Sequence, residues 1–262
     1  MMEAVLIITV ILITGITGHR VKSLSTSGAI AAFLVGIAVY AGVGSKGLLI
    51  LVIFFATSSL WSNYKSAAKK TVEDKLAKGA TRDWRQVFAN GGTAAFFSIL
   101  YFFHPDSILL VGFIVALASA NSDTWASEIG SLSKKDPIYI RTLQRVGRGT
   151  SGAVSPLGSS AALLGSLTIA LVSLWVFKLD FLVFILVFIF GFLGNMIDTL
   201  LGAYFQQVFV CRQCGTETEK REHCGQPTRR IKGIALIEND MVNFISGLLA
   251  ALLAMGVSVL LL

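Results

Sequence analysis

The stretch SILLVGFIVALASANSDTWASEIG, residues 107–130, begins as an apolar run and ends in a polar segment. At a rise of about 1.5 Å per residue, a helix of this length crosses a hydrocarbon core about 30 Å thick. Its last part nevertheless carries Asp123 and Glu128. An ionised carboxylate in the middle of a membrane helix costs about 2.5–3.5 kcal/mol. We therefore expect these two acids to have a role in the function of the protein.

The composition of the whole chain indicates a membrane protein. Of 262 residues, 54% are hydrophobic and 14% are charged, and the mean hydropathy is +0.74. In a typical soluble domain, about half of the residues are apolar and about a quarter are charged. With four prolines and no long polar block, the chain offers no boundary between separate domains. We therefore predict one all-α integral membrane domain over residues 1–262.

Apolar stretches long enough to cross a bilayer predict about eight transmembrane helices. The first could be mistaken for a signal peptide, but it has no basic region before it and opens with Glu3. We expect it to be a helix. The predicted spans lie near residues 2–18, 28–44, 47–62, 87–104, 107–130, 152–177, 181–209 and 240–262.

The distribution of cations predicts the orientation of these helices, because cytoplasmic loops are enriched in Lys and Arg. Alternate loops, at 19–27, 63–86, 131–151 and 210–239, hold 20 of the 22 Lys and Arg residues. Both termini are therefore expected outside, most simply in the cell membrane. The net charge of +7 then reflects loops on one side, and no nucleic-acid partner is expected.

Two similar segments point to an internal repeat. TSGAIA begins at Thr26 and TSGAVS begins at Thr150, each after a basic loop and four spans apart. A degenerate 4+4 parallel repeat would have halves 1–106 and 107–262. So short a match also arises by chance. If the halves share ancestry, the first is expected to be scaffold, because the acids inside the spans belong to the second.

Four acids lie within or at the ends of the later spans, and the predicted topology places all of them toward the cytoplasmic side. Intramembrane acids are usually functional, paired or directed toward a polar cavity. These four could line one inner vestibule. They are Asp123, Glu128, Asp198 and Asp240, and the asparagines that accompany them are Asn121, Asn195, Asn239 and Asn243.

The chemistry of this group suits a magnesium ion. Carboxylate and amide oxygens are hard ligands, and Mg²⁺ in proteins takes one or two carboxylates together with substrate phosphates. We predict that the four acids are catalytic Mg²⁺ ligands. The alternative is that polar side chains join helices by hydrogen bonds, and it stays open for Asn195, Asn243 and Ser122.

The segment RVGRGTSGAVSPLG, residues 145–158, formally contains G-x-G-x-x-G. No strand precedes it, so the dinucleotide-fold interpretation fails. A Gly-rich segment before a helix still presents N–H groups to an anion. We predict phosphate binding here, and the alternative is close helix packing. The residues concerned are Arg145, Arg148, Gly149, Thr150, Ser151 and Gly152.

Two basic loops flank these motifs. Lys134 and Lys135, with Arg141 and Arg145, are expected to hold either a polyanionic substrate or anionic lipid headgroups. The loop 65–85 carries charges of both signs and is expected to be an exposed amphipathic helix.

The three cysteines fall in one loop, 210–239, together with a histidine. Cytosolic thiols stay reduced, so a disulfide is not expected. Three thiolates and one imidazole make a complete tetrahedral set for structural zinc. Free thiols beside an incidental histidine are the alternative. The ligands of this zinc-knuckle-like loop would be Cys211, Cys214, His223 and Cys224.

The motifs SANSDTWASEIG, GRGTSGAVSPLG, GNMIDTLLGA and ENDMVN together resemble an integral membrane family that includes the plant chloroplast phytyl-phosphate kinase. The resemblance covers almost the whole chain. The cysteine loop matches only some members, so zinc is not expected to be essential. Matching motif positions are Asn121, Asp123, Glu128, Gly149, Thr150, Ser151, Gly152, Asn195, Asp198, Asn239, Asp240 and Asn243.

The resemblance implies that an isoprenoid monophosphate is phosphorylated to its diphosphate by a nucleoside triphosphate, with CTP as the expected donor. The expected partners are therefore that lipid, the nucleotide and membrane lipids, and a homo-oligomer is left open. A coupled transporter is the main alternative from another class. A CTP-dependent lipid nucleotidyltransferase or polyprenol kinase is the third, since its motifs are loosely similar.

Overall fold

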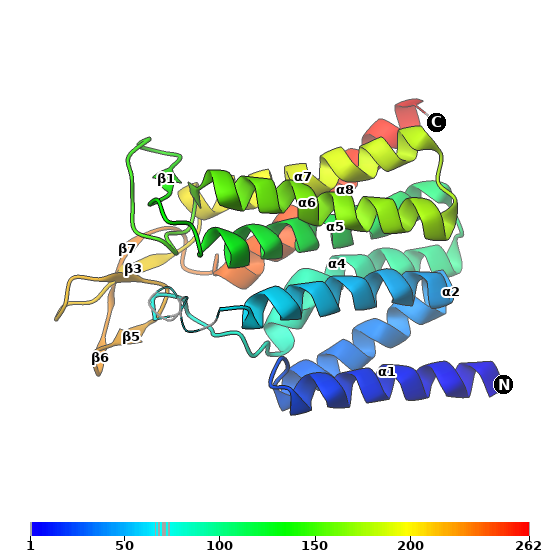
Figure 1. Ribbon diagram of the computed structural model, residues 1–262, viewed down its shortest axis with the longest axis horizontal. Coiled ribbons are helices and arrows are strands. Elements are labelled where there is room, and N and C mark those ends of the chain that lie inside the picture. Colours follow the sequence, from blue (N-terminus) through cyan, green and yellow to red (C-terminus); the bar gives the residue numbers. More distant parts are fainter. Residues whose placement is uncertain (1, 66, 68, 70–71, 73, 262) are drawn as a thin grey trace.

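Long helices lie side by side along one axis in the computed structural model, which describes residues 2–65, 67, 69, 72 and 74–261 (Figure 1). The bundle is all-α, with small strands at one end. The helices are α1 (Met2–Arg20), α2 (Thr26–Asn63), α4 (Trp84–Phe103), α5 (Ser107–Gly130), α6 (Pro156–Phe177), α7 (Phe181–Tyr204) and α8 (Asn239–Leu261).

A break divides α2 into two limbs. Gly44 has φ 73° and ψ −162°, a conformation that is open almost only to glycine. The limbs run in opposite directions, so that both ends of α2 lie at the same end of the bundle (Figure 1). Hydrogen bonds agree, because Arg82 contacts Ser25 near the start of α2 and Ser59 near its end. The two helices expected at 28–44 and 47–62 therefore correspond to the two limbs.

Side-chain caps set where the helices begin. Asp83 and Gln86 form a capping box at the start of α4, and Ser155 accepts from the Gly158 N–H at the start of α6. The expected start of that span at 152 is wrong, because Gly152 has φ 84° and the helix begins at Pro156. The span expected to reach 209 ends at Tyr204.

The apolar helices make this an integral membrane type of fold. Within the described part of the chain, five helices are long and apolar enough to cross a membrane, and they are α2, α5, α6, α7 and α8. A shorter apolar helix covers Val5–Arg20. The two segments of the expected internal repeat differ in structure, because the one at Thr26 begins a helix and the one at Thr150 forms a turn before a helix. The repeat therefore stays a prediction.

The core is centred on α5, which packs against α2, α4, α6, α7 and α8. Its residues from Val111 to Ser122 are all buried. Glycines of α7 permit this close packing, since a Cβ on Gly194 would overlap the Ser119 hydroxyl and one on Gly191 would overlap Ala118. The polar end of α5 is thereby fixed between α6, α7 and α8.

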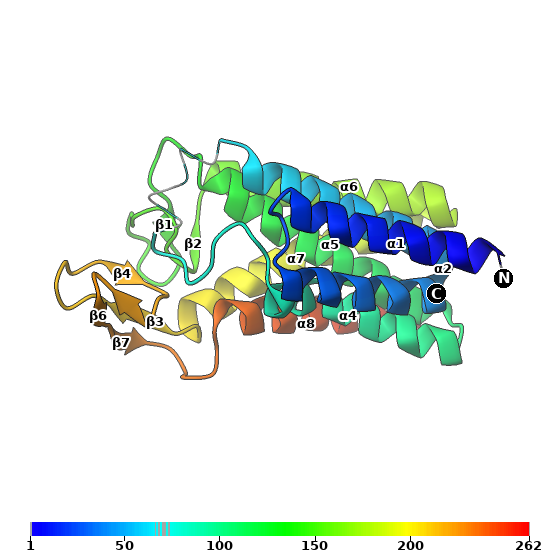
Figure 2. The ribbon, with the colours of Figure 1, turned by 90° about the horizontal axis from the view of Figure 1, so that it is seen from below.

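The strands and the longer loops gather at one end of the bundle, opposite both termini (Figures 1 and 2). We call this the loop end. β1 (Ile138–Tyr139) pairs with β2 (Ala153–Val154), and β5 (Glu222–His223) pairs with β6 (Gln226–Pro227). The third sheet has the order β4-β3-β7, formed by β4 (Glu217–Thr218), β3 (Val208–Val210) and β7 (Arg229–Lys232).

The loop 64–83 matches only part of the exposed helix that was expected over 65–85, since Ala67, Lys69 and Val72 are helical. Part of that prediction, including Glu73, lies outside the described residues. Residues 74–83 consist of turns and extended chain, and Lys69 is buried. The described part of this loop covers the site below.

Candidate functional site

A cavity of about 290 Å³ lies at the loop end, and we call it the polar cavity. The ends of α5 and α7, the starts of α4 and α8, and the Gly-rich turn before α6 form its wall. Polar side chains dominate this wall. They include Ser62, Arg82, Gln86, Asn90, Asp123, Glu128, Arg148, Thr150, Ser151, Asn195, Asp198, Glu219, Asn239 and Asn243.

Asp123 of α5 and Asp198 of α7 both line the polar cavity. α5 stays helical through Asp123 to Gly130. The Asn195 amide donates to Asp123 Oδ1 at 3.1 Å, and the Ser246 hydroxyl donates to Asp198 Oδ2 at 3.1 Å. Oriented to satisfy its hydrogen bonds, the Asn243 amide also donates to Asp198 at 3.0 Å. Among the described residues, no cation lies within 4.0 Å of either carboxylate.

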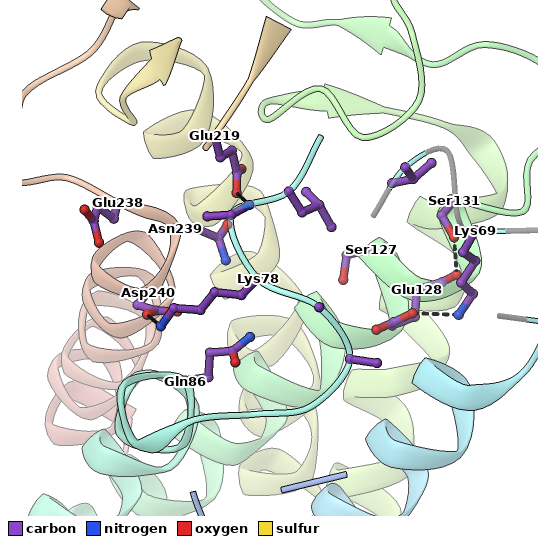
Figure 3. Close-up of a pocket in the computed structure, with 15 residues that line it drawn as sticks. Lys69, Lys78, Gln86, Ser127, Glu128, Ser131, Glu219, Glu238, Asn239 and Asp240 are labelled. Carbon is purple, nitrogen blue, oxygen red and sulfur yellow. Dashed lines mark hydrogen bonds and ion pairs between the residues drawn. The ribbon is translucent and has the colours of Figure 1, made fainter. Parts of the chain in front are cut away.

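Glu128 lies five residues beyond Asp123 on α5 but has a different environment. Buried Lys69 donates to its Oε2 at 2.6 Å, and Ser62 donates to its Oε1 at 2.7 Å. Figure 3 shows this pair beside Ser131, whose hydroxyl bonds the Glu128 carbonyl. The negative charge of Glu128 is thus already neutralised by Lys69 from the loop 64–83.

Asp240 faces an adjoining cavity of about 160 Å³ rather than the polar cavity. There it forms an ion pair with Lys78 (Figure 3). Lys78 also bonds Asp83 at 2.8 Å. Burial alone would lower the pKa of Lys78, but its hydrogen bonds with the two aspartates and their negative charges outweigh burial and raise that pKa. Lys78 therefore stays charged and ties the loop 64–83 to the start of α8.

The structure separates the four acids that the sequence analysis grouped around one ion. Asp123 and Asp198 share the polar cavity with amides, whereas Glu128 and Asp240 are each paired with a lysine. Both lysines come from the loop 64–83, a long-range contact that helix periodicity does not reveal. Two carboxylates rather than four are left to meet a substrate or an ion.

The Gly-rich turn combines both roles weighed for it. Gly152 is a packing residue, because at φ 84° its added Cβ would meet the backbone of Ala203. Arg148, Gly149, Thr150 and Ser151 line the polar cavity. Within the turn, the Thr150 N–H bonds the Gly147 carbonyl, and Arg148 contacts the Ser131 and Ser133 carbonyls at 3.4 Å. The turn thus packs on α7 and directs an arginine at the cavity.

Several predicted site residues lie elsewhere. Asn121 is fully buried and joins helices, since it accepts from Thr57 at 3.1 Å and donates to the Gly165 carbonyl at 2.8 Å. It is a structural residue and does not line the polar cavity. The exposed cations do not line it either, because they extend from the loop 131–147 toward solvent. They are Lys134, Lys135 and Arg145.

Sequence reasoning missed the contribution of the first half. Arg82 enters the polar cavity and donates to the hydroxyls of Ser59 at 2.9 Å and Ser62 at 3.3 Å. Burial lowers the pKa of its guanidinium, opposed by the negative charge of Glu128. Gln86 and Asn90 follow it on α4. The D-x-x-Q capping box directly after Arg82 could have placed that residue at a helix start.

Glu219, from the loop between α7 and α8, was also missed. It accepts from the Gln206 amide at 2.7 Å and from the Ala77 N–H at 3.3 Å. Burial raises the pKa of Glu219, hydrogen bonds lower it, and the charges of Asp240 and Glu238 raise it further. Glu219 lines both cavities, so it joins the cysteine-containing loop to the site.

The four sulfur and nitrogen ligands predicted for zinc come together; we call them the cysteine cluster. Their ligand atoms all lie within 4.8 Å of one another. Cys211 and Cys214 flank the turn after β3, and His223 and Cys224 belong to the β5–β6 hairpin. Cys224 has φ 53° and Gly225 has φ 72°, as the two-residue turn of such a hairpin requires. The His223 Nδ1 faces both Cys214 and Cys224.

Comparisons with known proteins place this chain in a family. Protein PGR of Arabidopsis thaliana is 31% identical over 92% of this chain and 91% of its own length. An uncharacterized membrane protein of Methanocaldococcus jannaschii, MJ0933, is 32% identical over 76% and 82%. Protein VTE6, chloroplastic, of Arabidopsis thaliana is 29% identical over 71% of this chain and 57% of its own length.

No solved structure matches the chain. The family model described as "Integral membrane protein DUF92" matches residues 9–251, which is nearly the whole bundle and includes every residue of the polar cavity. The chain therefore belongs to the DUF92 family of integral membrane proteins.

Proposed function

We propose that this protein is a membrane-embedded prenyl monophosphate kinase of the phytyl-phosphate type. It would transfer the γ-phosphate of a nucleoside triphosphate, with CTP as the first candidate, to an isoprenoid monophosphate. One observation carries the proposal. Asp123 and Asp198, for which the described residues provide no cationic partner, share a cavity with Glu219, two arginines and a Gly-rich turn, where apolar helices meet polar loops.

The polar cavity has the parts that phosphoryl transfer needs. Catalysis of this reaction is mainly positioning and neutralisation of phosphate charge. Arg82 and Arg148 supply positive charge from opposite halves of the chain. An acceptor that is already a phosphate is itself an anionic nucleophile, so a general base is less necessary than for an alcohol. The carboxylates are thus free for another role.

That role is to hold Mg²⁺, and the residues present fit this ion. Asp123 and Asp198 supply hard oxygens, and Asn195 and Asn243 orient the two carboxylates by hydrogen bonds. When bound, Mg²⁺ would neutralise charge on the phosphate oxygens. Glu128 and Asp240 would keep their lysine partners and hold the loop 64–83 over the site instead.

The membrane arrangement is part of the proposal. The seven long helices of the described residues, with α2 counted as two limbs, would make eight crossings of the cell membrane. The cation-rich loop end would face the cytoplasm, where nucleotides are available, and both termini would lie outside. A coupled transporter needs a site near the middle of the bilayer, open to both faces. The position of the polar cavity at the loop end favours the enzyme.

We further propose that the cysteine cluster binds one structural zinc ion. Three sulfurs and one imidazole within mutual reach match a closed four-ligand site. Cys224 adopts a left-handed conformation that costs a non-glycine residue about 1–2 kcal/mol, and a metal bond would offset that cost. Zinc would then stabilise the loop that carries Glu219.

The decisive experiment is a product assay with the purified full chain in detergent. We would incubate it with Mg²⁺, labelled CTP or ATP, and phytyl, geranylgeranyl and dimethylallyl monophosphates. We expect labelled prenyl diphosphate and the nucleoside diphosphate. Release of inorganic diphosphate with a nucleotidyl-lipid product would show a nucleotidyltransferase instead, and absence of any transfer would contradict both.

A further inference from the structure

A third cavity, of about 340 Å³, lies between α1, the two limbs of α2 and the start of α4. We call it the apolar groove. Its walls are almost entirely aliphatic and aromatic, with Val10 from α1, Val35 and Val52 from α2, and Phe54 and Phe55 near the end of α2. The function proposed above makes no use of this groove.

The apolar groove and the polar cavity meet at three residues. Arg82, Gln86 and Asn90 line both. These residues mark the start of α4 and its first two turns, so charged and amide side chains line the groove where it meets the cavity of Asp123 and Asp198, whereas Thr14 and Ser45 add only hydroxyls elsewhere. Figure 1 shows α1, both limbs of α2 and α4 adjacent to one another, with the start of α4 at the loop end.

In the described part of the chain, no carboxylate oxygen comes within 4.0 Å of the Arg82 guanidinium at this junction. The guanidinium donates hydrogen bonds to the hydroxyls of Ser59 and Ser62. Arg82 is partly buried, and a cation withdrawn from water normally has a counter-charge, because desolvation is otherwise uncompensated. An arginine fork also fits phosphate oxygens in two-point contact. An anionic group of a ligand would complete this site.

We propose that the apolar groove holds the hydrocarbon chain of a lipid monophosphate and that Arg82 binds its phosphate. One cation at the end of one apolar groove matches one anionic head on an apolar chain. The inference rests on the proposed function, and it assigns the acceptor to the first half of the protein. Arg148, on the Gly-rich turn, is then left to the nucleotide. The first half therefore binds substrate and is not only scaffold.

The head-group assignment is tested by binding, without turnover. We would measure the affinity of purified protein for phytyl monophosphate and for phytol, its uncharged alcohol. Because Arg82→Gln loses a charged hydrogen-bonding partner, we expect it to bind phytyl monophosphate at least about tenfold more weakly than wild type. Its affinity for phytol should change little. Arg82→Lys should recover part of the affinity for the monophosphate. Equal affinities of Arg82→Gln and wild type for the monophosphate would overturn the assignment.

The chain assignment is tested by narrowing the groove. Ala32→Phe places a ring in it, whereas Ala41→Phe, on the same limb of α2 but exposed and outside the groove, is the matched control. We expect Ala32→Phe to weaken geranylgeranyl monophosphate binding at least about tenfold and to spare dimethylallyl monophosphate. Val52→Trp narrows the groove from the other limb and serves if Ala32→Phe does not fold. Unchanged affinity for the long chain in a folded groove variant would overturn the proposal.

The two proposals fail in distinguishable ways. If wild type binds prenyl monophosphates with this dependence on Arg82 and chain length but forms no diphosphate, the kinase assignment fails and the lipid site stands. If the diphosphate forms at the same rate and affinity in wild type, Arg82→Gln and Ala32→Phe, the lipid site fails and the kinase assignment stands.

Discussion

At the scale of single residues, the partner of each acid decides its role. Asp123 and Glu128 lie five residues apart on one helix, yet one faces amides in the polar cavity and the other is paired with Lys69. In the sequence, both are acidic residues in the same polar segment of one helix, and nothing there distinguishes their roles. The difference is supplied by the loop 64–83, where Lys69 pairs with Glu128 and Lys78 pairs with Asp240, and no described lysine pairs with Asp123 or Asp198.

The unpaired acids are expected to be the sensitive ones. Asp123→Asn and Asp198→Asn should each lower kcat by about 100-fold or more, because each removes a negative charge that would hold Mg²⁺ near the phosphates. Asp180→Asn is a matched control, since Asp180 is exposed before α7 and makes no capping hydrogen bond. Steady-state rates of the three folded variants give the test. Wild-type turnover in Asp123→Asn and Asp198→Asn would remove the proposed metal site.

At the scale of elements, local backbone conformation shapes both the groove and the cysteine cluster. Gly44 separates the limbs of α2, and the apolar groove is lined by both limbs. The β5–β6 turn brings Cys224 beside His223 through two residues with positive φ. In both places a few dihedral angles set the geometry of a larger feature.

The break in α2 can be tested with two glycines that both have open space around them. Gly44→Ala should lower the free energy of unfolding by about 1–3 kcal/mol, because alanine does not tolerate φ 73° with ψ −162°. Gly256→Ala lies in the helical interior of α8 and should be neutral or slightly stabilising. Thermal unfolding in detergent compares them. A Gly44→Ala variant as stable as Gly256→Ala would contradict the strained break.

Zinc content tests the cysteine cluster. Cys214→Ser should abolish stoichiometric zinc in elemental analysis and lower the thermal midpoint by at least about 2–4 °C, since the loop loses a cross-link. Turnover per folded molecule should stay nearly unchanged, because the cluster does not line the polar cavity. Gln213→Ser, between the two cysteines and exposed, should keep its zinc. Wild-type protein without zinc would refute the site.

At the scale of the whole molecule, the bundle is asymmetric along its axis. The strands lie at the loop end and the two termini lie at the other end (Figure 2). The polar cavity, the adjoining cavity and most of the cations also belong to the loop end. Under the proposed function, nucleotide chemistry would take place at one face of the membrane. The lipid chain would enter between helices and would meet that face only with its phosphate.

Orientation can be measured with the native cysteines, because all three lie in the loop between α7 and α8. A membrane-impermeant maleimide should leave the wild-type protein unlabelled in intact spheroplasts and should label it after permeabilisation with a chelator present. Leu260→Cys, exposed near the opposite end, should be labelled without permeabilisation. Labelling of the native cysteines in intact spheroplasts would reverse the orientation.

The sequence by itself determined the membrane class, the positions of the apolar helices and the small set of polar motifs. These properties follow from composition and from helix-length hydrophobic runs, which are local. It also brought Asp123, Asp198, Arg148 and the cysteine ligands to notice, because such residues are costly or unusual where they stand.

Only the tertiary structure decided which acids are already neutralised and where the first half contributes. Lys69 pairs with Glu128, and Arg82 joins the polar cavity to the apolar groove, through contacts between segments far apart in the chain. Spacing in the sequence shows which residues share a face of one helix, whereas a cavity is lined by the faces of several helices. The partner of a charge therefore emerges only when helices and loops are packed together.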